Sequence, residues 1–222
     1  MNFPIFLAHI AFVVGSVLLA LRLGKTSLVA WIVLQAVLAN LFVVKQMELF
    51  GLTVTCSDVF AIGAILGLNL LQEHFGKKEA KKAVNISFFA LLFFGCMALI
   101  HLAYVPSPSD ETHEAFRLIF SSTPRIIAAS FAVYWLVQKW DIYFFQWLQK
   151  RFDGKRLAIR LWVSLFVSQA IDTILFSLLG LYGIVDSVFD IMVLSYGVKC
   201  FIITLGAPIA AYSKKWIQKE AA

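Results

Sequence analysis

The chain alternates long apolar stretches with short polar breaks, a pattern typical of a protein that crosses a membrane several times. A transmembrane helix needs about 20 predominantly apolar residues. Stretches close to this length predict seven spans, at residues 3–21, 27–47, 54–72, 84–104, 120–140, 158–182 and 188–212. This number predicts a six-helix core preceded by one extra N-terminal helix, with residues 1–222 forming a single transmembrane domain.

Composition indicates the same fold class. The 222 residues are 61% hydrophobic and 14% charged, whereas a soluble domain is typically about 45–50% apolar and about 25% charged. Lipid offers the backbone no hydrogen-bond partner, so only helices and closed barrels cross it. The apolar stretches are unbroken and do not alternate as barrel strands do. The sequence therefore predicts an all-α, polytopic transmembrane helix bundle.

The basic residues predict the orientation of this bundle. Most of the 19 Lys and Arg fall in every second break, as in the clusters at 77–82 and 150–156. The opposite loops carry acidic residues such as Glu48, Asp110 and Glu111. Because cytoplasmic loops are enriched in Lys and Arg, we expect a multi-pass protein of the cell inner membrane with its N-terminus outside and its C-terminus cytoplasmic. The net charge of +6 then reflects basic cytoplasmic loops that face anionic lipid headgroups, and it does not indicate nucleic-acid binding.

Charged side chains also occur within the apolar stretches. A charge in hydrocarbon costs from roughly 3 to more than 10 kcal/mol, so such residues face a protein interior or a watery cavity. Two are acidic and two are basic, which allows them to neutralise one another along a solute path. The alternative is a structural role, as counter-charges or as contacts to the outer headgroups. These residues are Asp58, Arg125, Asp172 and Lys199.

The sixth predicted span contains the densest polar cluster, Ser168-Gln169-Ala170-Ile171-Asp172-Thr173. Gln169 and Asp172 are three residues apart and share a helix face. An amide beside a carboxylate can bind both donors and acceptors on the edge of a heterocycle. A polar clamp between helices is the alternative interpretation.

Further polar candidates lie in the second and third spans. Asn69 and Glu73 fall at helical spacing near the end of the third, where Gly76 suits a helix C-cap. Glu73 has the alternative of being an interface residue beside the lysine cluster. Asn40 lies in the second span, where a lone Asn more often bonds neighbouring helices than binds a ligand.

The sequence contains no HExxH, Gly-x-Ser-x-Gly, Walker or CxxC motif. Cys56, Cys96 and Cys200 lie far apart in apolar segments, so neither a metal nor a cofactor is expected. A membrane-embedded enzyme would need His101, Glu73 and Asp172 to converge. A transporter is therefore the favoured interpretation, ahead of an enzyme and of a purely structural scaffold.

Four motifs follow one another along the chain: Asn69-x-x-x-Glu73-x-Phe75-Gly76, Pro124-Arg125-Ile126-x-Ala128-Ala129-Ser130, Ser168-Gln169-x-x-Asp172-Thr173 and Tyr196-x-x-Lys199. Together they resemble the queuosine precursor transporter family, a vitamin-uptake-like family of small integral membrane proteins. The resemblance runs from about Asn40 to the C-terminus. Asn69 and Ser195 stand where many or some members are expected to have Asp, which bears on the choice among substrates.

The resemblance implies uptake of 7-deazaguanines (cyano- or aminomethyl-deazaguanine, or the free base queuine) for the queuosine modification of tRNA. We expect a midplane pocket between spans two, three, five, six and seven that opens alternately to each side. Alanine at Asp172 or Glu73 is predicted to abolish uptake while membrane expression stays normal. The candidate substrate-binding residues are Asn40, Asn69, Glu73, Arg125, Gln169, Asp172 and Lys199.

The alternative within transport is a substrate-binding subunit of an energy-coupling-factor-type importer, which works only with an external ATPase module. Expected partners are the small-molecule base and membrane lipid. A homodimer is left open, and no direct nucleic-acid partner is expected.

Overall fold

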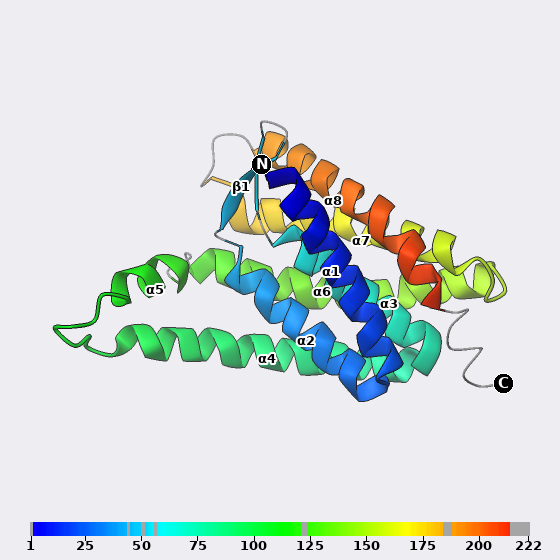
Figure 1. Ribbon diagram of the computed structural model, residues 1–222, viewed down its shortest axis with the longest axis horizontal. Helices are drawn as coiled ribbons and strands as arrows, with labels where there is room; N and C mark the ends of the chain where they lie inside the picture. The colour runs from blue at the N-terminus through cyan, green and yellow to red at the C-terminus, as the bar shows by residue number, and fades with distance from the viewer. Residues whose placement is uncertain are drawn as a thin grey trace.

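The computed structural model describes residues 2–43, 45–49, 52–55, 57–120, 124–183 and 188–213. Long helices dominate this part of the chain and run side by side as one elongated bundle (Figure 1). They are α1 (Asn2–Arg22), α2 (Lys25–Leu41), α3 (Asp58–Phe75), α4 (Lys77–Ala103), α6 (Pro124–Arg151), α7 (Leu157–Phe176) and α8 (Val188–Ala211). The shorter elements are the strands β1 (Gln46–Leu49) and β2 (Leu52–Thr55), helix α5 (His113–Phe120) and the π-helical turn η1 (Ser177–Leu181).

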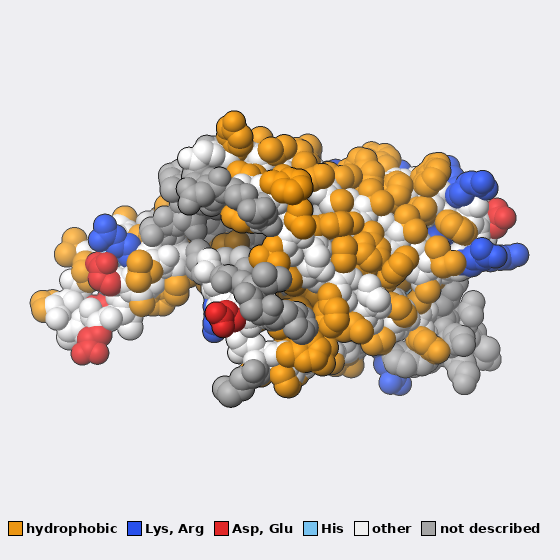
Figure 2. Space-filling model, turned by 90° about the horizontal axis from the view of Figure 1, so that it is seen from above, with side chains coloured by type: hydrophobic (Ala, Val, Ile, Leu, Met, Phe, Trp, Pro, Cys, Tyr) orange, Lys and Arg blue, Asp and Glu red, His pale blue; other side chains and the backbone are white. Residues whose placement is uncertain are grey.

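The two ends of the bundle differ in charge. One end, called here the hairpin end, holds the β1–β2 hairpin and the start of α1, where Asn2 Nδ2 donates to Glu48 O at 3.0 Å. The other, called the basic end, holds the α1–α2, α3–α4 and α6–α7 turns; Lys25 and Glu79 pair there at 3.4 Å. Lys and Arg side chains gather at this end, and the surface between the ends is largely apolar (Figure 2). The alternation of basic and acidic breaks in the sequence thus corresponds to two physical ends.

The prediction of an all-α helix bundle is confirmed, and four of the described helices are long and apolar enough to cross a membrane. These are α1, α4, α7 with η1, and α8 from Ile191. Helix α2 is a shorter apolar helix. Helices α3 and α6 are long enough but less apolar, and both carry buried polar side chains such as Asn69 and Asp141. The predicted total of seven spans remains a prediction.

The second and third predicted spans differ from the structure. The stretch 27–47 was expected to be helical throughout, but α2 ends at Leu41 and Gln46–Leu49 pairs antiparallel with Leu52–Thr55. The β-branched run Thr53-Val54-Thr55 favours a strand, so α3 begins only at Asp58. Helix α5 was also not predicted as a separate element, and α6 begins at Pro124, within the fifth predicted span.

Helix α3 lies at the centre of the bundle. Every residue from Ile62 to Gln72 is buried. Gly63 and Gly67 allow α2 to approach closely, because a Cβ at Gly67 would lie 2.9 Å from Ile32 Cγ1 and 3.0 Å from the Trp31 ring. Small residues four apart are a common contact between membrane helices. As predicted, Gly76 ends α3, with φ +88°, and α4 starts directly after it.

Candidate functional site

A buried lysine joins three helices in the half of the bundle nearer the hairpin. Lys199 Nζ of α8 donates to Asp172 Oδ2 at 2.9 Å and to Thr173 Oγ1 at 3.0 Å, both of α7. It also lies 3.9 Å from Asp58 Oδ1 of α3. The side chains of Lys199 and Asp58 are 6% and 9% exposed, whereas that of Asp172 is 25% exposed. Two carboxylates therefore share one cation, and one of them remains accessible.

This Lys199 cluster (Lys199, Asp58, Asp172) forms part of the wall of a cavity of about 220 Å³. Residues of α2, α3, α6, α7, η1 and α8 line the cavity, so it lies between the five helices expected to surround a substrate. Asn40, Tyr134 and Phe176 contribute an amide and two aromatic rings to the same wall. The cavity thus combines opposite charges with flat apolar surfaces.

Local structure explains how these side chains reach the cavity. Asp58 is the first residue of α3, where the positive end of the helix dipole favours a carboxylate. The π-helical turn after Phe176 presents Ser177 and Leu181 to the cavity, and such turns are frequent at functional sites. Tyr196 Oη donates to Phe166 O at 3.2 Å, which ties α8 to α7 one turn before Lys199.

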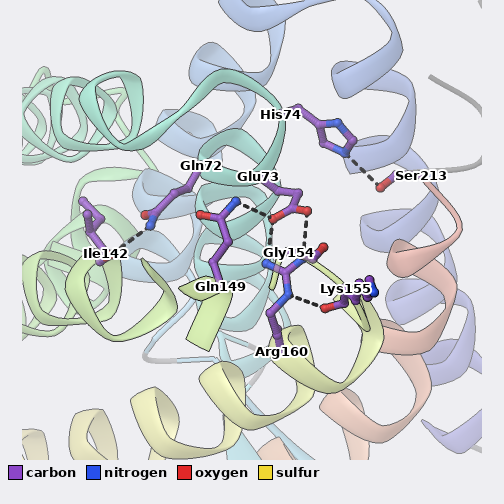
Figure 3. Close-up of polar contacts among 9 residues, drawn as sticks. All are labelled: Gln72, Glu73, His74, Ile142, Gln149, Gly154, Lys155, Arg160 and Ser213. Atoms are coloured by element: carbon purple, nitrogen blue, oxygen red, sulfur yellow. Dashed lines mark hydrogen bonds and ion pairs between the residues drawn. The ribbon is translucent and has the colours of Figure 1, made fainter. Parts of the chain in front are cut away.

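Glu73 lies apart from this cavity, in a second ion pair at the basic end (Figure 3). Arg160 Nη1 and Nη2 of α7 donate to the two Glu73 oxygens at 2.7 and 2.8 Å. Gln149 Nε2 adds a bond to Glu73 Oε2 at 3.3 Å. The side chains of Arg160 and Glu73 are 0% and 4% exposed. This arrangement is a closed clamp between α3, α6 and α7.

Arg160 also shapes the α6–α7 turn. Its Nε donates to Lys155 O at 2.9 Å, and its Nη2 to Gly154 O at 3.1 Å. Asp153 and Arg156 have positive φ in this turn, at 49° and 53°, a conformation that non-glycine residues adopt rarely. The guanidinium therefore holds two turn carbonyls and one carboxylate together, a structural task.

Asn69 and Gln169 are buried, at 0% and 1% exposure. The oxygen and nitrogen of both side-chain amides have no hydrogen-bond partner among the described residues. Neither residue lines the cavity, although Gln169 lies one helical turn from Thr173, which does. Unsatisfied buried amides cost about 1–3 kcal/mol each, so these atoms are available to a ligand or a buried water.

The remaining predicted residues are placed as follows. Asn40 lines the cavity, and its Nδ2 donates to Ala36 O at 3.0 Å. Arg125 belongs to the first turn of α6, but its side chain lies outside the described part of the structure. Cys56 also lies outside it. The structure therefore brings Asn40, Asp172 and Lys199 to one cavity and leaves Glu73 elsewhere.

His101 does not approach either acid. It lines a larger cavity of about 530 Å³ between the ends of α4 and α5, together with residues such as Phe94 and Phe116. Asp172 is paired with Lys199 and Glu73 with Arg160. The convergence that a membrane-embedded enzyme would need is absent from the described residues.

Sequence reasoning missed a third polar group, formed by Asp141, Ser164 and Ser168. Both serines of α7 donate to Asp141 Oδ1 of α6, at 2.6 and 2.5 Å. Helix α6 extends past the predicted end of the fifth span at residue 140, and this extension carries Asp141 into the bundle. The helical spacing of the two serines was the available signal, but it did not name their partner.

These features define a class of protein. A multi-pass helix bundle in which five helices enclose a cavity with buried opposite charges is the arrangement of a membrane transporter for a small polar solute.

Comparison with known proteins names the family. Residues 55–213 match the family described as "Putative vitamin uptake transporter". The chain is 34% identical over 226 residues to the "Probable queuosine precursor transporter" of Bacillus subtilis (strain 168), across 99% of this chain and 96% of that protein. No solved structure matches the chain. The chain belongs to this family of transporters, which are not enzymes, and the resemblance stated from its motifs is confirmed.

Proposed function

We propose that the protein imports queuosine precursors across the cell inner membrane and binds a 7-deazaguanine in the cavity beside Lys199. The observation that carries this proposal is the Lys199 cluster itself, two carboxylates and one ammonium at a cavity wall. The name of the Bacillus subtilis relative, similar over nearly the whole chain, supports the substrate class.

The chemistry of the cluster suits a guanine-like edge. Such an edge presents two adjacent N–H donors beside a carbonyl acceptor. The accessible carboxylate of Asp172 accepts the donors, and the ammonium of Lys199 donates to the carbonyl. Because the unmade hydrogen bonds of a desolvated site are costly, such a site rejects analogues that lack one of these groups.

The aromatic side chains of the cavity wall contribute affinity by stacking, without hydrogen bonds to the edge of the base. Tyr134 and Phe176 line the cavity, and stacking of a base on an aromatic ring contributes about 1–3 kcal/mol. A volume of about 220 Å³ falls below the roughly 300–1,000 Å³ of drug-sized sites, which favours a compact bicyclic base. Asn40 supplies a further polar contact at the rim.

The other predicted residues have supporting roles in this proposal. Gln169 and Asn69 offer unpaired amides that a ligand or water reaches when the helices move. Arg125 stays a candidate at the start of α6. Glu73 holds α3 to α6 and α7 through Gln149 and Arg160, and so supports the bundle rather than binding the base.

Transport requires the cavity to open alternately to each side. The proposed orientation places the hairpin end outside and the basic end in the cytoplasm, because Lys and Arg concentrate at the basic end and cytoplasmic loops are enriched in them. Residues 1–222 then act as a single transmembrane domain that contacts lipid, either alone or as a homodimer.

The decisive experiment is rescue of a bacterium that can neither make nor import deazaguanines. Each candidate base is fed at nanomolar level, and queuosine is measured in tRNA. Rescue by the wild-type chain is expected, with the most effective base naming the substrate, and loss of rescue in Asp172→Asn is expected. Glu114→Gln, an exposed acidic residue of α5, is the matched control. Absence of rescue by every base, with protein present in the membrane, contradicts the proposal.

Purified protein in liposomes separates this function from that of an energy-coupling-factor-type subunit. A self-sufficient transporter exchanges external radiolabelled base for internal unlabelled base. Base binding without any exchange, restored by an ATPase module, would instead identify the chain as a binding subunit.

A further inference from the structure

Asp141 is the buried acid that the proposed function does not use. It is 0% exposed and lies in the interior of α6. Its Oδ1 accepts hydrogen bonds from Ser164 and Ser168, whereas Oδ2 is buried without a hydrogen-bond partner among the described residues. Every ion pair formed between described residues leaves Asp141 out.

Asp141 differs from the other buried acids in the described part of the chain because each of those pairs with a cation. Asp58 and Asp172 share Lys199, and Glu73 holds Arg160. An ionised carboxylate in an apolar interior without a cation is strongly disfavoured, so such a group takes a proton instead. Two serine donors serve one oxygen of Asp141, which leaves the second oxygen able to take a proton.

The charged groups on the elements around α6 are engaged elsewhere. Lys78 and Lys82 of α4 are exposed, and η1 contributes no titratable side chain. Other charged groups have partners: Arg160 with Glu73, Asp58 and Asp172 with Lys199, His74 with Ser213, Lys77 with Gln146 and Tyr143, Lys81 with Tyr143, Lys139 with Asn85, and Glu79 with Lys25.

Two polar stripes on α6 and α7 extend from the region of Asp141 toward the clamp and toward the cavity. On α7, Arg160, Ser164, Ser168 and Asp172 recur every four residues, so one helix face leads from the clamp at the basic end to the cavity. On α6, Tyr134, Gln138 and Asp141 follow at the same kind of spacing. Tyr134 lies one helical turn from Gln138 and lines the cavity.

We propose that Asp141 is the proton-carrying site that couples uptake to a proton gradient. In each cycle the carboxylate takes one proton onto Oδ2 from the hairpin end and later releases it to water at the basic end. No bond other than O–H forms or breaks, and the gradient supplies the energy. Buried acids inside membrane helix bundles commonly mark proton relays. The proposal rests on the proposed transport function and adds its energy source.

The test uses the full-length protein in liposomes and each of the three radiolabelled deazaguanines. Two readouts are compared: exchange at equal pH on both sides, and accumulation driven by an inwardly directed proton gradient. Wild-type protein is expected to show both. Asp141→Asn, which mimics the protonated acid, is expected to exchange the base and to lose gradient-driven accumulation. Asp141→Glu, which retains an acid, is expected to recover part of it.

The outcomes distinguish proton coupling at Asp141 from the proposed transport function. Absence of exchange by wild-type protein for all three bases overturns the transport function itself. Exchange without a response to the proton gradient, or accumulation driven by a sodium gradient instead, overturns proton coupling alone. Gradient-driven accumulation that survives in Asp141→Asn shows that the proton binds elsewhere.

A second variant covers the case in which Asp141→Asn does not fold. Ser164→Ala/Ser168→Ala keeps the acid and removes both donors to Oδ1. A hydrogen bond to a charged group is strong enough to move a titration by about one pH unit or more. The pH profile of gradient-driven accumulation is expected to shift by about one pH unit or more. The pH profile of exchange at equal pH is expected to match that of wild type. An unshifted profile overturns the proposal.

Discussion

The Glu73–Arg160 clamp and the Lys199 cluster both place opposite charges between helices of the same bundle, yet they differ in how completely the charges are satisfied. In the clamp, one guanidinium meets both carboxylate oxygens and two backbone carbonyls. In the Lys199 cluster, one ammonium serves two carboxylates, at 2.9 and 3.9 Å, beside a cavity. A saturated pair holds helices together, whereas an unsaturated one beside a cavity can accept a ligand.

The largest expected effect comes from breaking the clamp. Arg160→Met removes the cation from a carboxylate that stays buried, and breaking a buried ion pair costs about 3–5 kcal/mol. We expect a clear loss of folded protein and a lower melting temperature, measured by size-exclusion chromatography after heating.

The double variant Glu73→Gln/Arg160→Met is expected to recover part of that stability, because no charge is left buried. A melting temperature of Arg160→Met equal to that of wild type would show that the clamp is not structural. On the same grounds, Glu73→Ala is expected to reduce uptake mainly by reducing the amount of folded protein.

The next largest effect is expected on binding. Asp172→Asn keeps the shape of the side chain and removes the charge that meets the base and Lys199. A hydrogen bond to a charged group contributes about 1.5–3 kcal/mol, so affinity for the base is expected to fall roughly 10- to 100-fold. Equilibrium binding to purified protein measures this effect. Wild-type affinity in a folded Asp172→Asn protein would show that the base does not bind at the Lys199 cluster.

A smaller effect is expected at the other carboxylate. Asp58 lies farther from Lys199 and is less exposed than Asp172, so it is expected to stabilise the charge of Lys199 rather than to contact the base. Asp58→Asn is expected to weaken binding by about 0.5–1.5 kcal/mol, or roughly 2- to 10-fold, in the same assay. A larger loss than in Asp172→Asn would reverse the assigned roles.

The smallest effect is expected at an exposed pair. Lys25 and Glu79 lie 3.4 Å apart, and their side chains are 47% and 24% exposed. Exposed salt bridges contribute about 0–1 kcal/mol. Glu79→Gln is therefore expected to leave both the melting temperature and uptake close to wild type. A large fall in melting temperature would mean that charge at the basic end matters beyond the clamp.

The sequence was sufficient for the helical class and for the approximate position of each long helix. Hydropathy and length set these features, since lipid admits little besides helices. The prediction from the sequence was wrong at the β1–β2 hairpin. The stretch 27–47 stays mostly apolar past the end of α2, and hydropathy does not distinguish an apolar strand from the last turn of an apolar helix.

The candidate site was predictable in part. The sequence allowed Asp172 and Lys199 to neutralise each other, and they lie 2.9 Å apart. Glu73 looked equally suited to bind substrate, yet the structure pairs it with Arg160, which the sequence analysis had not singled out. Spacing within a helix shows which residues share a face, but not which helix that face meets.

By itself, then, the sequence determined that the chain forms apolar helices, where its polar residues interrupt them, and which family its motifs resemble, because these depend on local composition and order. The tertiary structure decided which charges meet. The partners Glu73 and Arg160 are 87 residues apart in the chain, and their contact depends on the packing and rotation of α3 against α7. The same packing left Asp141 buried with only serines beside one of its oxygens.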